Sequence, residues 1–426
     1  MNKVLIITYY WPPGSGAGVQ RWLKFAKYLP ESGWEPVILT VDPEYAAYPV
    51  TDYSLEGEVS GNLSVYRTRA TDWFRIYKKD KTKIPSAGFA ANDSNSIAGK
   101  ITRFIRGNFF IPDPRKGWNK YALAKASELI KANDIRHIIT TSPPHSTQLI
   151  GLELKKRHPE IVWIADLRDP WTDIYYYDSF YHTSLARKID AKYEEKVLKK
   201  ADRIITVGKS LKNSLCLRVP GIENKIVVIT NGYDKEDFTG LPDVVPDIFT
   251  ISYIGTLSDS YPVSAFIDAI NKLDKKGYRI RLRFVGSVSS RQQNLIRSET
   301  GSLMTEFIPY VNHKDAVRYM NESSVLLLII PDHRSNRSII TGKLFEYLAS
   351  SRPVLCIGPA DGDAADILGI TGHGKSADYN DTEGISGIIE EYCMAGQRTG
   401  LSAPPEFSRE KLTEKLASLL HYKDPH

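Results

Sequence analysis

The stretch that decides the fold is MNKVLIITYYWPPGSGAGVQRWLKFAKYL, residues 1–29. Residues 4–8 form a β-branched apolar run that predicts a buried strand, and the glycine-rich turn GSGAG follows a Pro-Pro pair. Apolar residues then recur at helical spacing, namely Val19, Trp22, Leu23, Phe25, Ala26 and Leu29. Strand, glycine turn and helix in this order direct backbone N–H groups toward a phosphate. The other interpretation is an ordinary turn in which glycine supplies a positive φ.

The rest of the chain alternates strands with helices. The expected strands are 4–8, 36–41, 63–67, 136–140, 161–165, 203–207, 226–229, 250–255, 281–285, 325–330 and 353–357. The expected helices between them include 119–133, 184–200, 264–276, 313–321 and 343–350. This alternation predicts parallel sheets with helices on both faces. We therefore expect an α/β protein with two doubly wound, Rossmann-like domains, 1–232 and 249–405, joined by the polar, Pro- and Gly-containing stretch 232–248.

Composition limits the class of protein. A chain of 426 residues that is 42% hydrophobic is large enough for two domains. Its three cysteines have no paired spacing, so neither a disulfide framework nor a metal site is expected. No cleavage site follows the first strand, and the longest apolar run, 325–330, is too short to cross a bilayer. We expect a reduced, cytoplasmic protein.

Positive charge is concentrated in residues 75–125, which contain 12 Lys/Arg and only 3 acidic residues. Residues 75–118 also interrupt the alternation of strands and helices and are expected to be an insertion. Within it, one helical face is apolar, with Ile97, Ile101, Phe104, Ile105 and Phe109, and the opposite face carries Lys100, Arg103 and Arg106. A basic amphipathic helix suits an anionic membrane surface. The alternative is a helix that packs its apolar face on its own domain; nucleic acid is disfavoured because no binding module accompanies the charge.

The second domain repeats the pattern of strand, glycine turn and helix found in the first. A strand at 250–254 precedes Gly255-Thr256-Leu257, and a strand at 282–285 precedes Gly286. In SIITGKLFEYLASSRPVLCIGP, residues 338–359, a helix begins at Gly342 and offers free N–H groups to a diphosphate. Lys343 would add a point charge, and Glu346 could accept hydrogen bonds from a ribose. The alternative is that both are solvated charges on the helix.

Motifs along nearly the whole chain resemble those of the family 4 glycosyltransferases of the GT-B fold. They are GSGAG, ITNGYDKEDF at 229–238, YIGTL at 253–257, FVGS at 284–287 and GKLFEYLASSRPVL at 342–355, with DPRKGW, TSPPHS and IADLRDPW in 113–171 resembling a bacterial polysaccharide subgroup. The resemblance implies two domains facing a cleft, an acceptor-side first domain and a nucleotide-sugar-binding second domain. It also implies retention of anomeric configuration, no cofactor and no required metal. A last helix, about 408–421 within the segment 406–426, would cross back to the first domain.

The resemblance also implies donor-binding residues. They are Gly14, Ser15, Gly16, Gly18, Gly255, Thr256, Gly286, Arg337, Thr341, Gly342, Lys343, Leu344 and Glu346. Two departures stand out: Ser338 replaces the first acid of the family's two-glutamate signature, and Thr256 replaces an arginine that grips phosphate. Asn336 or Arg337 are candidates for the sugar contact. Candidates for the phosphate charge are Lys343, Lys209, Arg334 and Arg337, and the donor nucleotide is left open between UDP and GDP.

Catalytic candidates follow strands of the first domain. Asp166, Arg168 and Asp169 come at the end of the strand 161–165, so we expect them at the carboxyl edge of the sheet. Sugar transfer needs a group near the anomeric carbon and one that positions the acceptor hydroxyl, and Asp166 or Asp169 could supply these. The alternative is a structural Asp-Arg pair. His145 follows the strand 136–140 and is a further candidate for contact with the acceptor or the sugar. The alternative is that its role is purely structural.

The sequence thus predicts a cytoplasmic glycosyltransferase on the inner face of the plasma membrane, acting on a lipid-linked saccharide for a capsule or O-antigen. A first alternative is an NAD-dependent oxidoreductase or epimerase, since Asp42 ends the second strand where a Rossmann fold holds a ribose. The spacing GxGxG after WPP argues against it. A second alternative is a catalytically silent nucleotide-binding homologue, which Ser338 and Thr256 would allow.

Overall fold

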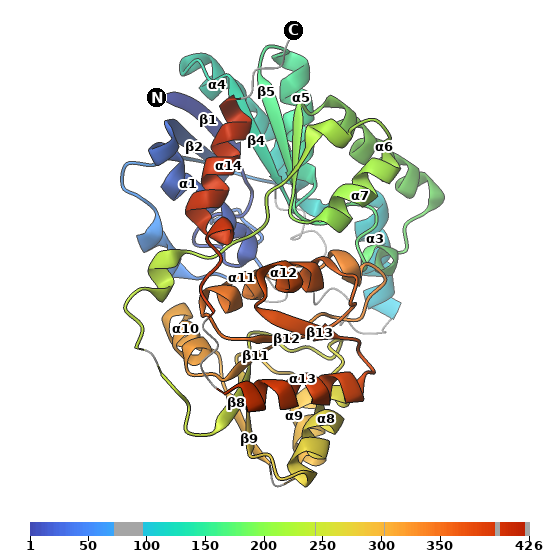
Figure 1. The fold of residues 1–426 in the computed structure, drawn as a ribbon. Helices are drawn as coiled ribbons and strands as arrows, with labels where there is room; N and C mark the ends of the chain where they lie inside the picture. Colours follow the sequence, from blue (N-terminus) through green and yellow to red (C-terminus); the bar gives the residue numbers. More distant parts are fainter. Residues whose placement is uncertain (72–96, 243, 302, 397–400, 422–426) are drawn as a thin grey trace. The chain divides into compact units, whose positions relative to one another are not determined.

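The computed structural model describes residues 1–71, 97–242, 244–301, 303–396 and 401–421 (Figure 1). The chain divides into two compact units, Met1–Thr230 with Leu412–His426, and Asn231–Lys411. Each unit has its own parallel sheet, which confirms the α/β class with two Rossmann-like domains. The stretch 232–248, expected as a linker, falls within the second unit. Much of the basic segment, residues 75–96, lies outside the described residues.

The first unit contains a seven-stranded parallel sheet of order β3-β2-β1-β4-β5-β6-β7. Its strands are β1 (Asn2–Ile7), β2 (Trp34–Val41), β3 (Ser64–Thr68), β4 (His137–Ser142), β5 (Val162–Leu167), β6 (Arg203–Thr206) and β7 (Ile226–Val228). Its helices are α1 (Ala17–Tyr28), α3 (Ile97–Phe109), α4 (Asn119–Ala132), α5 (Ser146–Arg157), α6 (Ser184–Lys200), α7 (Lys209–Arg218) and α14 (Arg409–His421). All of the strands expected in this unit are present.

Alternation along the strands builds two cores in the first unit, one on each face of the sheet. Val4 and Ile6 pack with apolar residues of α1 and α14, whereas Leu5 and Ile7 pack with those of α4 and α5. Helix α14 therefore covers the same face as α1, and Figure 1 shows it in red across the strands. Its last residue, His421, accepts a hydrogen bond of 3.1 Å from Trp34 Nε1.

Helix α3 has an exposed apolar face and two arginines that lie against aromatic rings. Arg103 is 9% exposed and its guanidinium carbon lies 5.5 Å from the centre of the Tyr181 ring. Arg106 stacks on Phe180 at 4.1 Å. Ile97, Ile101, Phe104 and Phe109 are instead exposed. The helical period was predicted correctly. The exposed apolar stripe differs from the alternative in which this face packs on the domain, and contact with a membrane stays a prediction. The inward position of Arg103 and Arg106 was not predicted.

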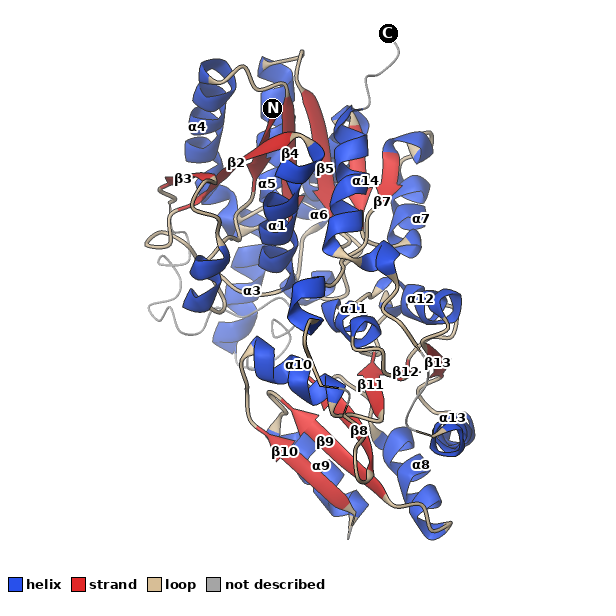
Figure 2. Ribbon diagram, turned by 60° about the vertical axis from the view of Figure 1, so that its left-hand side comes forward, coloured by secondary structure: helices blue, strands red, loops and turns tan. Residues whose placement is uncertain are grey.

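The second unit has a six-stranded parallel sheet of order β10-β9-β8-β11-β12-β13 (Figure 2). Its strands are β8 (Phe249–Ile254), β9 (Ile280–Val285), β10 (Met304–Ile308), β11 (Val325–Ile329), β12 (Val354–Ile357) and β13 (Gly374–Ala377). Its helices are α8 (Ser264–Lys275), α9 (Ser290–Thr300), α10 (His313–Asn321), α11 (Gly342–Ala349), α12 (Asp363–Thr371) and α13 (Thr382–Ala395). The sequence analysis missed β10 and β13, which are the two edge strands.

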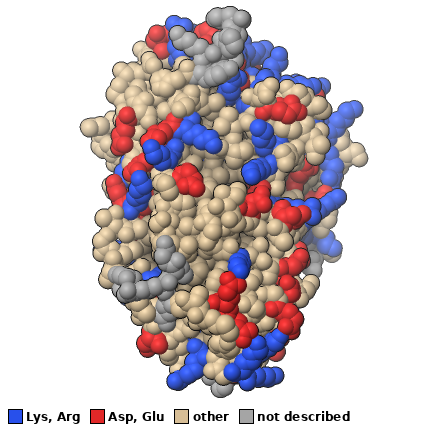
Figure 3. All heavy atoms as spheres, viewed as in Figure 1, with Lys and Arg blue, Asp and Glu red and all other residues tan. Residues whose placement is uncertain are grey.

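The second sheet is also covered on both faces. Ile251 and Tyr253 of β8 pack with α8 and α13, while Ile254 packs with α11 and α12. This confirms the expected doubly wound arrangement. Among the described residues, no helix has the length and apolar content needed to cross a bilayer. On the face shown in Figure 3, acidic and basic side chains are interspersed.

Candidate functional site

In doubly wound sheets, ligands bind at the carboxyl ends of the strands, because the connecting loops and helix N-termini meet there. All of the candidate residues from the sequence lie at such ends or at the helices that follow. The two units differ in what occupies this edge.

Asp166 lies in the core of the first unit and not on an open loop. Its side chain is fully buried and accepts hydrogen bonds from Arg21 Nη2 at 3.1 Å, Trp22 Nε1 at 3.0 Å and Thr141 Oγ1 at 2.7 Å. Arg21 is also fully buried and donates to the carbonyl oxygens of Ile229 and Thr230. A carboxylate held in this way ties β5 to α1 and has no face left for a substrate. The expectation that Asp166 could act on substrate is therefore corrected, and the structural alternative describes it.

Arg168 lies against the first turn of α1. It donates from Nε to the Ser142 carbonyl and from Nη2 to the Pro143 carbonyl, both at 3.1 Å. A Cβ atom at Gly18 would come within 2.2 Å of Arg168 Nη1. The Arg168 guanidinium thus passes close to Gly18 and brings a positive charge to the N-terminus of α1; a side chain at position 18 would have to displace it.

Asp169 remains a candidate carboxylate. Its side chain is half-buried and, among the described residues, receives no hydrogen bond. Burial raises the pKa of Asp169; Arg168 opposes this rise and Asp166 adds to it. A half-buried carboxyl group with a raised pKa suits proton transfer better than Asp166 does.

The glycine-rich turn uses part of its backbone internally. The Gly14 N–H donates to the Trp11 carbonyl at 2.9 Å, and the Ser15 N–H donates to the Val50 carbonyl at 3.1 Å. These two amides are therefore not offered to a donor, contrary to the expectation for Gly14 and Ser15. Gly16, with φ of 112°, caps α1, so the open amides of this turn are those that begin the helix.

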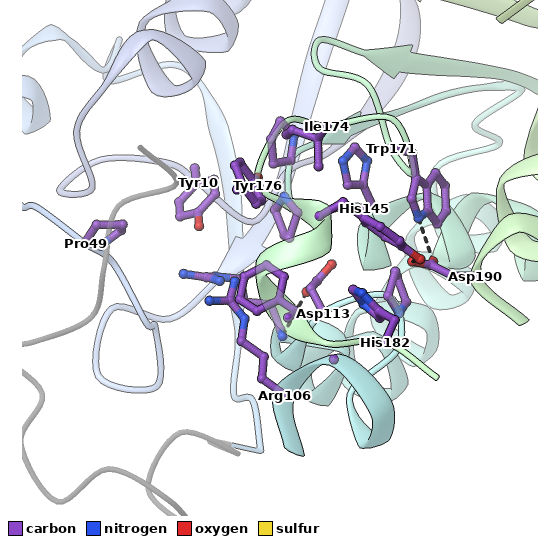
Figure 4. A pocket seen from close by; sticks show the side chains of 17 residues that line it. Tyr10, Pro49, Arg106, Asp113, His145, Trp171, Ile174, Tyr176, His182 and Asp190 are labelled. Carbon is purple, nitrogen blue, oxygen red and sulfur yellow. Dashed lines mark hydrogen bonds between the residues drawn. The ribbon is translucent and has the colours of Figure 1, made fainter. Parts of the chain in front are cut away.

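A cavity of about 100 Å³ opens at the same edge of the first unit (Figure 4). Its walls come from segments far apart in sequence, and most of its lining residues were missed by the sequence analysis. The labelled members are Tyr10, Pro49, Arg106, Asp113, His145, Trp171, Ile174, Tyr176, His182 and Asp190. The motifs DPRKGW and TSPPHS meet here, because Asp113 accepts hydrogen bonds from the Ser146 N–H and Oγ. That meeting was not foreseeable from spacing alone.

His145 lines this cavity, as a site residue would, and is stacked on Trp171 with ring centres 4.9 Å apart. Burial, with a smaller contribution from Arg168 and partial opposition from the Pro170 backbone, lowers the pKa of His145 to about 3. His145 is therefore neutral near pH 7. A neutral imidazole with so low a pKa can hydrogen-bond a hydroxyl but is a weak general base.

In the second unit, strands β8 and β9 end in glycines with positive φ. Gly255 has φ of 124° and Gly286 has φ of 118°, and a Cβ at Gly286 would lie 2.5 Å from the Gly255 carbonyl oxygen. A Cβ at Gly255 would meet Lys343 Nζ at 3.0 Å. Both glycines are therefore required by the close approach of the two turns and α11. Thr256, next to them, is exposed.

Lys343, in the first turn of α11, is held over Tyr253. Its Nζ donates to the Tyr253 hydroxyl at 2.7 Å and lies 4.2 Å from the ring centre, while that hydroxyl donates to the Thr256 carbonyl at 2.6 Å. Burial lowers the pKa of Lys343 to about 7, and Glu346 opposes this. An arriving anion would favour the protonated ammonium.

Other groups near the N-terminus of α11 lack partners. Thr341 Oγ1 is buried without a hydrogen bond among the described residues, and the structure shows none to the Glu346 carboxylate in that part of the chain. Burial raises the pKa of Glu346, with a smaller raising effect from Asp237 and opposing effects from His313, Arg409 and Lys343. The Leu344 side chain is in the core, so Gly342 and Leu344 offer only backbone groups.

The remaining donor-site candidates either form hydrogen bonds or ion pairs with other residues or are exposed. Ser338 Oγ donates to the Ser335 carbonyl, and Asn336 donates to the Tyr379 hydroxyl. Arg337 is exposed and forms an ion pair with Asp361 at 2.9 Å. Arg334 is exposed, and Lys209 is exposed in the first unit. In the described part of the chain, no group of three His, Cys, Asp or Glu side chains is arranged to hold a metal ion.

Residues 85–237 match the family model Glycosyltransferase Family 4. No curated protein sequence matches the chain significantly. Among solved structures, a glycosyltransferase from Rickettsia africae is 16% identical with a TM-score of 0.57, covering 98% of this chain and 93% of its own. HepE of Anabaena in complex with UDP and glucose is 12% identical with a TM-score of 0.59, covering 99% and 100%.

A third structure, sucrose-phosphate synthase from Thermosynechococcus elongatus, is 14% identical with a TM-score of 0.57 and covers 99% of this chain and 95% of its own. These likenesses extend over both units and carry the same fold. The resemblance read from the motifs is confirmed. The chain has the GT-B fold, and residues 85–237 are similar to glycosyltransferase family 4.

Proposed function

We propose that the protein is a retaining glycosyltransferase that moves a sugar from a UDP- or GDP-sugar to a lipid-linked saccharide in surface polysaccharide biosynthesis. The observation that carries this proposal is the edge of the second sheet. At this edge, the turns of Gly255 and Gly286 lie close to the N-terminus of α11. The Lys343 ammonium and the Thr341 hydroxyl, which has no hydrogen-bond partner among the described residues, belong to the same place. This combination suits a diphosphate, which needs backbone donors at close approach and a cation.

The roles of the residues follow from this placement. The α11 N-terminus and Lys343 would hold the diphosphate, and Glu346 would accept hydrogen bonds from the ribose. HepE of Anabaena, with the same fold, is known in complex with UDP and glucose, which supports a nucleotide-sugar donor here. We expect transfer without a metal or cofactor, with Asp169 as the catalytic carboxylate and Arg168 as a positive charge beside it.

Isothermal titration calorimetry with UDP, GDP and NAD tests the donor site directly. We expect one of the two nucleoside diphosphates to bind and NAD not to bind. Hydrolysis of the matching nucleotide-sugars then tests catalysis. Binding without turnover across a sugar panel would favour the silent homologue, and binding of NAD alone would favour the oxidoreductase.

We propose in addition that the outward face of α3 and α6 contacts an anionic membrane. On α6, Leu185 and Ile189 are exposed and share one helical face with exposed Lys188, Lys192 and Lys196. The exposed side chains of α3 are Ile97, Ile101, Phe104 and Phe109, and α3 packs beside α6 and the short helix Tyr177–Phe180. An apolar ridge beside a row of lysines is the pattern of a helix pair that lies in the lipid interface.

Flotation with phosphatidylglycerol-containing liposomes tests this membrane proposal. Replacing Ile101 and Leu185 with Ser should release the protein, whereas Ile370→Ser, an equally exposed isoleucine of the second unit, should not. Lys100→Glu should weaken binding. Replacing Arg103 and Arg106 with Glu would be a poorer test, because both arginines pack on aromatic rings. Unchanged flotation of the Ile101/Leu185 variant would contradict the proposal.

A further inference from the structure

The cavity of the first unit is built around one carboxylate that fixes two aromatic residues. Asp190 is 1% exposed and accepts hydrogen bonds from Trp171 Nε1 at 2.8 Å and from the Tyr177 hydroxyl at 3.0 Å. His145 stacks on Trp171 at 4.9 Å, and His182 stacks on Tyr177 at 4.1 Å. Two histidine–aromatic pairs therefore share a single anchor on α6, and both pairs border the cavity.

The histidines of these pairs present polar atoms that the protein itself does not satisfy. Both ring nitrogens of His145, and Nδ1 of His182, are shielded from solvent and form no hydrogen bond of good geometry among the described residues; the backbone of Pro170 is close to His145 and that of Tyr177 to His182. Burial lowers the pKa of both rings; Arg168 adds to this for His145 and Arg187 for His182. A neutral imidazole offers one donor and one acceptor, which matches the two capacities of a sugar hydroxyl. Buried polar atoms without partners are costly, so a ligand that satisfies them would be favoured.

The opposite wall is aromatic. Figure 4 shows Tyr10 and Tyr176 on the side of the cavity away from Trp171, with Arg106 of α3 reaching toward it. Aromatic faces pack against the apolar C–H face of a pyranose, while hydrogen-bonding groups read its hydroxyls. The volume of about 100 Å³ limits the occupant to a small group such as one ring inserted in part.

We infer that this cavity binds one pyranose ring of the acceptor saccharide, with His145 hydrogen-bonded to its hydroxyls and Asp190 acting as a positioning residue. That the bound sugar belongs to the acceptor rests on the proposed transferase function. Binding of the sugar to the cavity does not require a donor. Helix α3 then has two roles, because Arg106 and Gly107 line the cavity while the apolar residues of the same helix face outward.

Saturation-transfer difference NMR with methyl glycosides of glucose, galactose and N-acetylglucosamine tests the inference without donor or turnover. We expect transfer to at least one glycoside, reduced fivefold or more in His145→Ala and in His145→Phe. The phenylalanine variant keeps a ring to stack on Trp171 and removes only the nitrogens, so it separates hydrogen bonding from packing. His158→Ala is the matched control, because His158 ends the same helix α5 that His145 begins.

Asp190→Asn tests the positioning role. The amide cannot accept from both Trp171 and Tyr177, so we expect reduced transfer together with altered tryptophan fluorescence, while Asp178→Asn, an exposed carboxyl nearby, leaves both unchanged. Equal transfer in His145→Phe and the unmodified protein would overturn the inference, and so would absence of transfer to every glycoside. If nucleoside diphosphates still bind in that case, only the cavity inference fails; if they do not bind, the proposed function fails.

Discussion

The two units share a strand order but not the contents of the sheet edge. Six strands of the first sheet, β3-β2-β1-β4-β5-β6, follow the same order as the six strands of the second, β10-β9-β8-β11-β12-β13. In the first unit the edge is filled by a buried Arg21–Asp166 pair and an aromatic cavity. In the second unit, β8 and β9 end in Gly255 and Gly286, which have no side chains, so Lys343 of α11 can approach these strand ends closely.

This difference shows how one topology serves two kinds of ligand. A bare edge lets backbone N–H groups and a lysine approach a compact, highly charged group such as a diphosphate. An edge filled with rings and fixed hydrogen-bonding groups instead forms walls around a ligand with both apolar and polar faces. Substitutions that add a side chain to the glycine turns of the second unit, or remove one from the first unit, test this difference.

The largest effect is expected from Asp166→Ala. Removing this carboxylate leaves the buried Arg21 guanidinium without its counter-ion, which costs about 3–5 kcal/mol of stability. Because all seven tryptophans lie in residues 1–230, urea unfolding followed by tryptophan fluorescence reports on the first unit alone. Asp169→Ala is the control and should cost about 1 kcal/mol or less. If the urea midpoint of Asp166→Ala were close to that of the unmodified protein, the Arg21–Asp166 ion pair would not be what stabilises this edge of the first sheet.

The next effect is expected from Gly286→Ala, which fills the bare edge. The new Cβ would lie 2.5 Å from the Gly255 carbonyl in a backbone of φ 118°, so we expect a loss of about 1–3 kcal/mol. Hydrogen exchange followed by mass spectrometry, read on peptides of β8 and β9, measures it. Gly387→Ala in α13, where a Cβ meets nothing, should be neutral or stabilising. Equal exchange in both variants would count against close approach of the turns.

Lys343→Met should weaken binding of the nucleoside diphosphate about tenfold, or about 1.4 kcal/mol, through loss of a charged hydrogen bond. Since the pKa of Lys343 is about 7 and an anion favours its protonated form, affinity should fall as the pH rises above 7, with proton uptake on binding. Calorimetry in buffers of different ionisation enthalpy measures the uptake. Lys375→Met, a surface lysine paired with Glu391, should keep both affinity and pH dependence. Persistence of the pH dependence in Lys343→Met would assign it to another group.

A further effect depends on pH and concerns Glu194, beside the cavity anchor on α6. Burial raises its pKa to about 7, so its protonated form stabilises the fold below the ordinary value of 4.5, and this contribution is lost as the pH rises through 7. Glu194→Gln should therefore gain stability relative to the unmodified protein between pH 4.5 and 7, by at most about 1.4 kcal/mol per pH unit. Tryptophan-detected unfolding at several pH values measures this, and exposed Glu195→Gln should show no such trend.

Much of the fold was predictable from local pattern. Helices α6 and α10 begin and end where helical periodicity placed them, and the strands with continuous β-branched runs were found. β10 and β13 were missed because edge strands are half exposed and carry residues such as TEF and GKS, which have no apolar run. The period of α3 was evident, but which of its faces packs depends on Phe180 and Tyr181, more than 70 residues away in sequence.

The sequence by itself determined the two doubly wound sheets, the glycine turns at 255 and 286 and the helix that begins at Gly342, since each depends on residues close together in the chain. Only the tertiary structure decided that Asp166 is buried with Arg21, that Gly14 and Ser15 use their amides internally, and that His145 and His182 share the Asp190 anchor. The physical reason is that periodicity reports whether a side chain is buried, whereas the partner that satisfies it comes from whichever distant strand or helix the sheet brings alongside.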